Sequence, residues 1–198
     1  WIGMNMGLIR MDKQCVDNFE YFDSAMGLPS GASITAICFD YKRNIQYIGT
    51  DMAGIYYRHG QEHQFYRLSY AEESRTSEMI NNMIISDDKL YIASQGGFIV
   101  YDFDIETSYC NTTIDGLPHN KINFVYADPE GQIWFGPKDS GITSMSADGT
   151  FETHRLSDVP VNVAGMVVDD CERMWLATVN NGVLCTSNDS IVSISTAD

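Results

Sequence analysis

Short apolar segments recur along the chain at a nearly constant interval. Four of them open with a branched apolar residue and carry a second apolar residue three positions later, at residues 34–40, 80–86, 122–128 and 163–169. Their starts lie 46, 42 and 41 residues apart. Apolar stretches of this length are too short for a typical helix and are typical of buried strands. A period of forty-odd residues therefore predicts a repeat protein built from short strands.

A second apolar motif follows each of these segments after a turn rich in Asp, Asn and Gly, as in Asp128-Pro-Glu-Gly131. An aromatic residue lies at its centre, and the same motif opens the chain. These aromatic residues are Trp1, Tyr47, Tyr91, Trp134 and Trp175. We expect their rings to pack between neighbouring repeats, although a platform for stacking a ligand is the alternative.

A glycine and a further apolar run come next in every repeat, and a more polar stretch such as residues 64–68 or 108–113 closes it. Four antiparallel strands per repeat predict an all-β fold, a β-propeller fragment of four-stranded blades. We expect four complete blades and a partial N-terminal one within a single propeller domain or arc. The expected boundaries are 1–33 for the partial blade and 34–73, 74–115, 116–156 and 157–198 for the complete blades.

Composition narrows the classes of partner. The formal net charge of −15 repels phosphate backbones, so nucleic acid is not an expected partner. No apolar run approaches the roughly 20 residues of a membrane span, and we expect no direct membrane insertion by this fragment. The five cysteines form no CxxC pair, which argues against a disulfide framework or a zinc site.

Sequence motifs for catalysis are missing. The chain has no GxSxG, Walker, HExxH or EF-hand pattern, so we expect no enzyme activity, no cofactor and no metal site. Two carboxylates brought together from different blades, as a glycosidase needs, stay possible at this stage.

The blade geometry predicts where a ligand would bind. Connections between blades share one face with the turns between second and third strands, and loops on a rigid scaffold commonly carry binding residues. Amides, acids and bases gather there, as sugar hydroxyls require. The candidate ligand-binding residues are Asp51, Gln95, His119, Asn120, Lys121, Lys138, Asp139, Asn180 and Asn181. Capping of loops and turns is the alternative role for them.

The repeat resembles a known family. Residues Asp115-Gly-Leu-Pro-His-Asn120, followed by Gly131-Gln-Ile-Trp-Phe-Gly136 and Gly141-Ile142, resemble the two-component regulator propeller repeat. Met26-Gly-Leu-Pro-Ser30 matches it more loosely, and the blades at 74–113 and 157–196 lack Gly-Leu-Pro. The resemblance implies the periplasmic sensor region of a Bacteroides-type hybrid two-component histidine kinase and response regulator.

Such regions sense oligosaccharides released from glycans, so the resemblance implies an oligosaccharide ligand and a kinase outside this fragment. The remainder of the parent propeller is a further implied partner, and exposed blade surfaces favour self-association as a dimer. A protein-interaction propeller without a small ligand is the alternative, and a streptogramin-lyase-like propeller enzyme is a third reading.

Overall fold

The computed structural model describes residues 1–12, 18–70, 77–157, 159–187 and 190–194. Its strands form five antiparallel sheets, one of three strands and four of four strands, which we number blades 1 to 5 in chain order. The strands of blades 1 and 2 are β1 Ile2–Met4, β2 Gly7–Met11, β3 Phe19–Phe22, β4 Ile34–Asp40, β5 Ile45–Thr50, β6 Ile55–His59 and β7 Tyr66–Arg67. Those of blades 3 to 5 are β8 Ile80–Ser86, β9 Lys89–Ser94, β10 Phe98–Asp102, β11 Thr107–Asn111, β12 Ile122–Ala127, β13 Ile133–Pro137, β14 Ile142–Met145, β15 Phe151–His154, β16 Val163–Val168, β17 Met174–Thr178, β18 Val183–Ser187 and β19 Ser190–Ile194.

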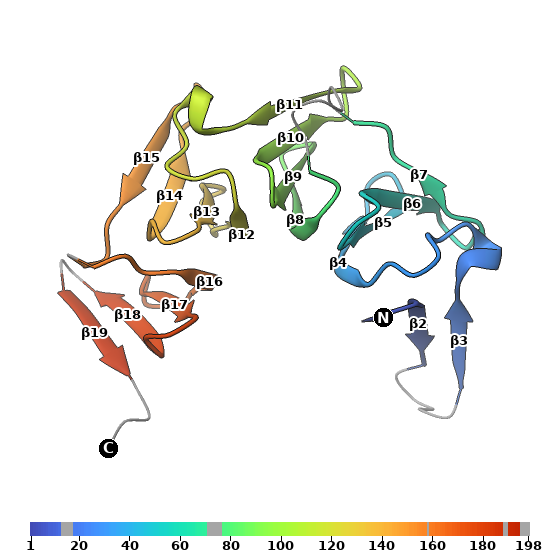
Figure 1. The fold of residues 1–198 in the computed structure, drawn as a ribbon, viewed down its shortest axis with the longest axis horizontal. Helices are drawn as coiled ribbons and strands as arrows, with labels where there is room; N and C mark the ends of the chain where they lie inside the picture. Colours follow the sequence, from blue (N-terminus) through green and yellow to red (C-terminus); the bar gives the residue numbers. More distant parts are fainter. Residues whose placement is uncertain (13–17, 71–76, 158, 188–189, 195–198) are drawn as a thin grey trace.

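The blades follow one another around an open arc (Figure 1), and the all-β propeller class is confirmed. The first strand of each complete blade lies toward the middle of the arc, and the fourth lies at its outside. Blade 1 and blade 5 lie on either side of the opening of the arc (Figure 1).

Two outer strands differ from their predicted limits. In blade 2 only Tyr66 and Arg67 pair with β6, because the buried Phe65 turns its N–H to the Met26 carbonyl at 2.7 Å. In blade 3 the strand ends at Asn111, because Thr112 caps a 3-10 turn, η2 (Thr113–Asp115). The first departure comes from the connection between blades 1 and 2, which contains Met26, and the second comes from the connection between blades 3 and 4. Neither effect was visible in the hydrophobic pattern.

A bulge after the first residue of every inner strand links neighbouring blades. The pairing register shifts there in β4, β8, β12 and β16. Bulges re-aim side chains, and the amide groups of Asn81 and Asn123 donate to the first carbonyl of the next inner strand, Ile122 O at 2.6 Å and Val163 O at 2.8 Å. This amide contact fixes blade 3 against blade 4 and blade 4 against blade 5.

The core lies between blades. Between blades 3 and 4, for example, the rings of Phe98 and Phe135 stack with centroids 4.3 Å apart, and both side chains are fully buried. Since aromatic side chains bury large apolar areas, these interfaces carry much of the stabilisation of the arc.

An aspartate at the end of two inner strands holds the tryptophan of the next strand. Asp128 and Asp169 each accept a hydrogen bond of 2.8 Å from an indole N–H, that of Trp134 and of Trp175. Their second oxygens accept backbone N–H groups of the intervening turn, such as Gln132 N at 2.8 Å. These bonds favour the carboxylate, so the pKa of Asp169 lies well below its usual range, chiefly because of the Trp175 bond.

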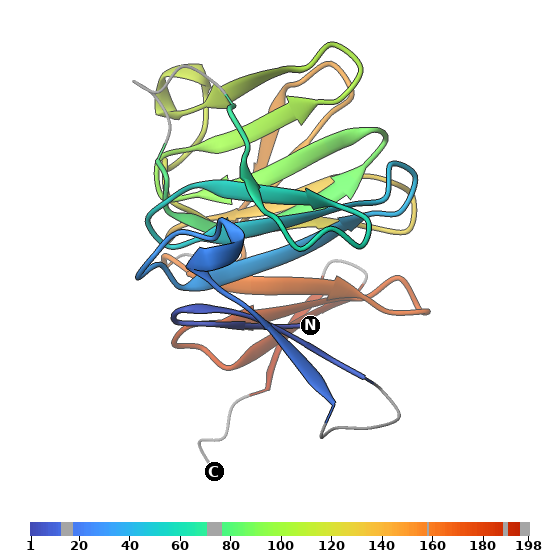
Figure 2. The same ribbon diagram turned by 90° about the vertical axis from the view of Figure 1, so that its right-hand side faces the viewer.

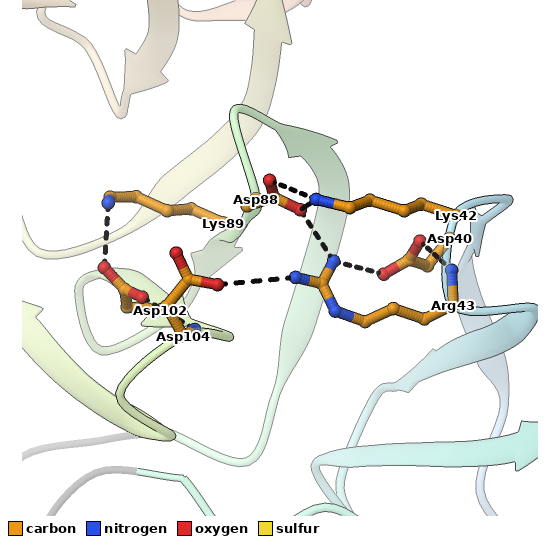
Figure 3. A network of polar contacts seen from close by, with 7 residues as sticks. All are labelled: Asp40, Lys42, Arg43, Asp88, Lys89, Asp102 and Asp104. Carbon is orange, nitrogen blue, oxygen red and sulfur yellow. Dashed lines mark hydrogen bonds and ion pairs between the residues drawn. The ribbon is translucent and has the colours of Figure 1, made fainter.

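Charged turns connect blades 2 and 3 (Figure 3). Asp88 in the β8–β9 turn contacts both Lys42, at 2.6 Å, and Arg43, at 2.9 Å, in the β4–β5 turn. Arg43 also bonds Asp40 at 2.9 Å, and its guanidinium lies over the ring of Phe103, 4.5 Å from the centroid. The Lys42 and Arg43 bonds lower the pKa of Asp88.

Two further findings concern the described part of the chain. It contains no helix long and apolar enough to cross a membrane. Cys38 and Cys185 are buried free thiols, and burial, reinforced by Asp40, raises the pKa of Cys38 to about 12. Cys15 lies outside the described residues.

Candidate functional site

Seen from the side, the connections between blades gather along one face of the arc (Figure 2). We call it the loop face; it carries the connection from each outer strand to the next inner strand and the turns after β5, β9, β13 and β17. The backbone N–H of the residue directly after each of these second strands donates to a carbonyl oxygen. That carbonyl belongs to the residue directly before the inner strand of the same blade. The four pairs are Asp51 N to Ser33 O, Gln95 N to Met79 O, Lys138 N to Lys121 O and Val179 N to Asn162 O. These bonds hold the loops in fixed positions on the scaffold.

The connection between blades 3 and 4 (residues 112–121) is closed by its own side chains. Thr112 and Asp115 form a capping box around η2, and Gly116 follows in the left-handed region with φ of 100°. The next residue, Leu117, is then only 4% exposed and packs against Phe98 and Phe135. The Gly-Leu-Pro motif is therefore a turn that places a leucine in the core between two blades.

The connection between blades 1 and 2 has the same construction. Asp23 caps the 3-10 turn η1 (Ser24–Met26), accepting Ala25 N at 2.8 Å. Gly27 follows with φ of 85°, and Leu28 is 4% exposed. In both connections, then, the residue directly after the outer strand is a cap and the leucine five residues later is buried.

The connection between blades 4 and 5 (residues 155–162) lacks this turn. The buried residue is Val161, whose carbonyl accepts Gly141 N at 3.1 Å, and Leu156 is half-buried. A pocket of about 370 Å³ lies beside this connection. Its lining is Pro118, Asp139, Ser140, Gly141, Thr153, Arg155, Leu156, Ser157, Val159, Pro160 and Val161. We call it the blade 4 pocket.

Arg155 occupies the place that the caps Asp23 and Thr112 hold in the closed connections, directly after the outer strand. Its side chain lines the blade 4 pocket and has no hydrogen-bond or ion-pair partner among the described residues. A guanidinium offers five N–H donors in a planar fork that suits carboxylates and paired hydroxyl groups. In this connection, therefore, a guanidinium without a partner among the described residues stands where the two closed connections have a capping residue.

Four of the residues predicted to bind ligand are brought together beside this pocket. His119 Nδ1 accepts Lys121 N at 2.8 Å, and Lys138 N donates to Lys121 O at 2.9 Å. Lys138 Nζ lies 3.6 Å from Asp139 Oδ2, and both side chains are about half exposed, at 43% and 50%. Asp139 itself lines the pocket, and His119 adjoins its Pro118 wall. The ion pair places the Lys138 ammonium and the Asp139 carboxylate beside the pocket, whereas Lys121 is placed there by its backbone bonds.

The other predicted residues belong to different loops, and several have bonds of their own. Asp51 accepts Ser33 N at 2.8 Å, Gln95 donates to Asn81 Oδ1 at 2.9 Å, and Asn120 accepts Thr113 N at 2.7 Å. Asn180 and Asn181 are exposed in the turn after β17. The structure thus gives Asp51, Gln95 and Asn120 roles within the loop scaffold.

Sequence reasoning missed most of the pocket. Ser140, Thr153, Arg155, Leu156 and Ser157 were not among the predicted residues. The available signal was the loss of Gly-Leu-Pro before blade 5, which marks a connection without its buried leucine. The other polar stretch without this motif, residues 69–78, includes residues 71–76, which lie outside the described part.

Among the described residues there is no group of three or more His, Cys, Asp or Glu side chains positioned to hold a metal ion. Hydroxyl, carboxylate and guanidinium groups line the blade 4 pocket, which suits a polar ligand rich in hydrogen-bonding groups.

One family model matches part of the chain. The two-component regulator propeller family model matches residues 116–139, which run from Gly-Leu-Pro to the turn at the blade 4 pocket. The resemblance seen in the repeats is thereby confirmed, and the chain is a propeller that contains a repeat of this family. No curated protein matches the chain in sequence.

Solved structures share the fold at low sequence identity. The extracellular domain of BT4673 from B. thetaiotaomicron, described once as a one-component and once as a hybrid two-component system, is 19% identical with a TM-score of 0.79. The match covers 99% of this chain and 29% of that one, so the chain spans less than a third of its length.

Two further neighbours have other roles. PorZ of Porphyromonas gingivalis, a surface component of the type-IX secretion system, is 18% identical with a TM-score of 0.66, covering 93% of this chain and 33% of PorZ. Virginiamycin B lyase of Staphylococcus aureus is 15% identical with a TM-score of 0.66, covering 84% of this chain and 57% of the lyase. Since these propellers differ in function, the shared fold alone does not assign one.

Proposed function

We propose that the chain is a ligand-sensing part of a longer two-component signalling protein, placed outside the cytoplasm, in the periplasm. It binds a glycan-derived oligosaccharide on the loop face and relays binding to a histidine kinase elsewhere in that protein. The family match at residues 116–139 and the extracellular neighbours support the sensor class. The blade 4 pocket is the observation that carries ligand binding.

The pocket chemistry supports a sugar with acidic groups. Arg155 is a free donor inside the pocket, and Lys121 and Lys138 lie beside it. Cations of this kind form charge-assisted bonds with uronate or sulfate groups, while Asp139, Ser140 and Ser157 can bond sugar hydroxyls.

A glycan array followed by calorimetry on the 198-residue chain and on the longer protein tests this proposal. The saccharide found should bind Arg155→Ala at least about tenfold more weakly, since a charge-assisted bond is lost. Arg67→Ala is the matched control, because Arg67 lies on β7 and pairs with Glu78, away from the pocket. Absence of binding to any saccharide, or equal loss in both variants, contradicts the proposal.

A protein partner is the second candidate. The neighbour YCF48, solved bound to D1 peptide, shares the fold at 11% identity with a TM-score of 0.68, covering 97% of this chain and 64% of YCF48. Blades 1 and 5, which flank the opening of the arc (Figure 1), also expose apolar side chains. They include Ile2, Met4, Val183, Ile191, Val192 and Ile194.

These faces favour association with a second copy of the chain. Analytical ultracentrifugation should then show a concentration-dependent dimer that Val192→Lys dissociates. A monomer at every concentration rejects self-association and leaves the sugar proposal untouched.

A further inference from the structure

A second pocket lies between blades 1 and 2, away from the loop face. Residues of the β4–β5 turn and of the segment after β6 line it, together with Trp1 and Arg10 of blade 1. Its volume is about 190 Å³. Gln46 on β5 and Arg58 on β6 form part of its wall. We call it the Arg58 pocket.

Arg58 is a buried cation whose partners are neutral. Arg58 as a whole residue is only 2% exposed. Nε donates to Gln46 Oε1 at 2.6 Å, and one terminal nitrogen donates to the Glu62 carbonyl at 2.6 Å. The guanidinium lies over the ring of Trp1, 4.6 Å from its centroid. Among the described residues no carboxylate forms an ion pair with Arg58. Burying a charge without a counter-charge is costly, so this group favours an incoming anion.

Gln46 points to the same conclusion independently. It is 3% exposed, and its oxygen is taken by the Arg58 bond, which fixes the orientation of the amide. Its nitrogen, Nε2, is buried and has no hydrogen-bond partner. Buried donors in folded proteins nearly always have an acceptor. The pocket thus has an unsatisfied amide donor beside an uncompensated guanidinium.

The local charge is consistent with these two observations. Burial, and then the nearby Arg10, lower the pKa of Arg58, and Glu20 opposes them. Glu20 itself pairs with Arg10 at 2.5 Å and with His63 at 2.8 Å. Asp40 also lines the pocket, and its carboxylate pairs with Arg43 at 2.9 Å. The carboxylates of Asp40 and Glu20 are thus engaged by other cations, and Arg58 is the cation of this pocket that lacks an ion-pair partner among the described residues.

We propose that the Arg58 pocket binds a carboxylate, with one oxygen accepting from Gln46 Nε2 and the other from the free N–H groups of Arg58. A planar carboxylate matches the fork of a guanidinium. The volume admits a small acid, such as one sugar-acid unit, rather than a chain of several. This site is separate from the blade 4 pocket, so it adds a second ligand contact to the proposed sensor.

Thermal unfolding of the 198-residue chain in the presence of glucuronate tests the site directly. Saturating glucuronate should raise Tm by about 2–4 °C, because a ligand that binds only the folded state stabilises it. Glucose, and sodium chloride at matched ionic strength, should leave Tm unchanged. If glucuronate produces no rise, or if glucose produces the same rise, the proposal is wrong. If sulfate raises Tm as much as glucuronate does, the assignment of the ligand as a carboxylate is wrong.

Single substitutions test whether glucuronate acts at the Arg58 pocket. Gln46→Glu places a carboxylate on Arg58 within nearly the same volume, so it should raise Tm without ligand and abolish the response to glucuronate. Gln64→Glu makes the same charge change on an exposed residue of blade 2 outside the pocket, and it should keep the response. A Gln46→Glu protein that still responds, or that unfolds at a lower temperature, contradicts the proposal.

A second substitution keeps the test decisive if Gln46→Glu does not fold. Gln46→Met retains the size of the side chain and removes the amide donor, so the affinity for glucuronate should fall at least about tenfold. Unchanged affinity rejects the site. Arg155→Ala should leave this response intact, which separates failure of the Arg58 pocket from failure of the blade 4 pocket.

Discussion

The connections on the two sides of blade 4 link equivalent strands in different ways. Before blade 4, Thr112 caps a short 3-10 turn and Leu117 enters the core between blades 3 and 4. After blade 4, Arg155 stands in the place of the cap and a pocket of about 370 Å³ lies beside the chain. In the first arrangement Thr112 and Asp115 bond each other within the turn, whereas in the second Arg155 has no hydrogen-bond or ion-pair partner among the described residues. In a repeat protein, loss of the repeat's own sealing residues is therefore a signal for function.

The largest expected loss of stability comes from replacing Leu117, the leucine buried in the connection before blade 4. Leu117→Ala should lower the free energy of unfolding by about 2–5 kcal/mol, because it leaves a cavity in a well-packed interface. Leu156→Ala, in the open connection, should cost much less, since Leu156 is already half-exposed beside a pocket. Urea denaturation measures both, and equal losses would remove the distinction between the two connections.

A smaller effect is expected at the glycine of the closed turn. Gly116 has φ of 100°, and a methyl group there would meet no atom within 4 Å, so only backbone strain opposes Gly116→Ala. The expected cost is about 1–2 kcal/mol. Gly165→Ala is the matched control, because its site is equally open and its φ lies outside the left-handed region. A neutral Gly116→Ala would show that the turn tolerates another conformation.

Acidification should lower the free energy of unfolding gradually. It should leave the contribution of Leu117 to that free energy unchanged. Bonds from Lys42 and Arg43 lower the pKa of Asp88, and a bond from Lys89 lowers that of Asp102. A carboxyl group with a lowered folded-state pKa stabilises the protein above its unfolded value of about 4, and this contribution is lost as pH falls through the folded pKa. Denaturation between pH 7 and pH 3 should therefore show falling stability below about pH 4. The difference between wild type and Leu117→Ala should stay constant above that range, since leucine does not titrate.

The smallest effect on stability is expected at Arg155. Arg155→Ala should change the free energy of unfolding by no more than about 0.5 kcal/mol, because the side chain is exposed and makes no bond in the described structure. Thr112→Ala, at the equivalent place, should cost about 1 kcal/mol through loss of its cap. Chemical denaturation of the pair tests this, and a larger loss at Arg155 would mean that it serves the scaffold.

The repeat period was sufficient to predict the blades. Inner strands β4 and β8 and second strands β5 and β9 have the limits expected from their apolar segments, because burial on both faces leaves a continuous apolar signal. The outer strand β7 was overestimated, since its edge is exposed and Phe65 leaves it for the neighbouring connection.

The binding face was harder to predict than the blades. Spacing placed His119, Lys121, Lys138 and Asp139 on one face, and the structure brings them together. It could not tell Gln95 and Asn120, which bond within the scaffold, from residues free to bind a ligand. Spacing also could not single out Arg58 and Gln46. An arginine next to aromatic residues on a strand has the same local sequence whether its side chain is buried or exposed.

The most direct test follows backbone amide signals by NMR while the oligosaccharide selected on the glycan array is added to the chain. Shifts should concentrate at residues 139–141 and 153–161, and the closed turn at Thr113–Asp115 should be unaffected. Shifts centred on the closed connections, or binding that leaves residues 139–141 and 153–161 unchanged, would contradict the claim that the open connection after blade 4 receives the ligand.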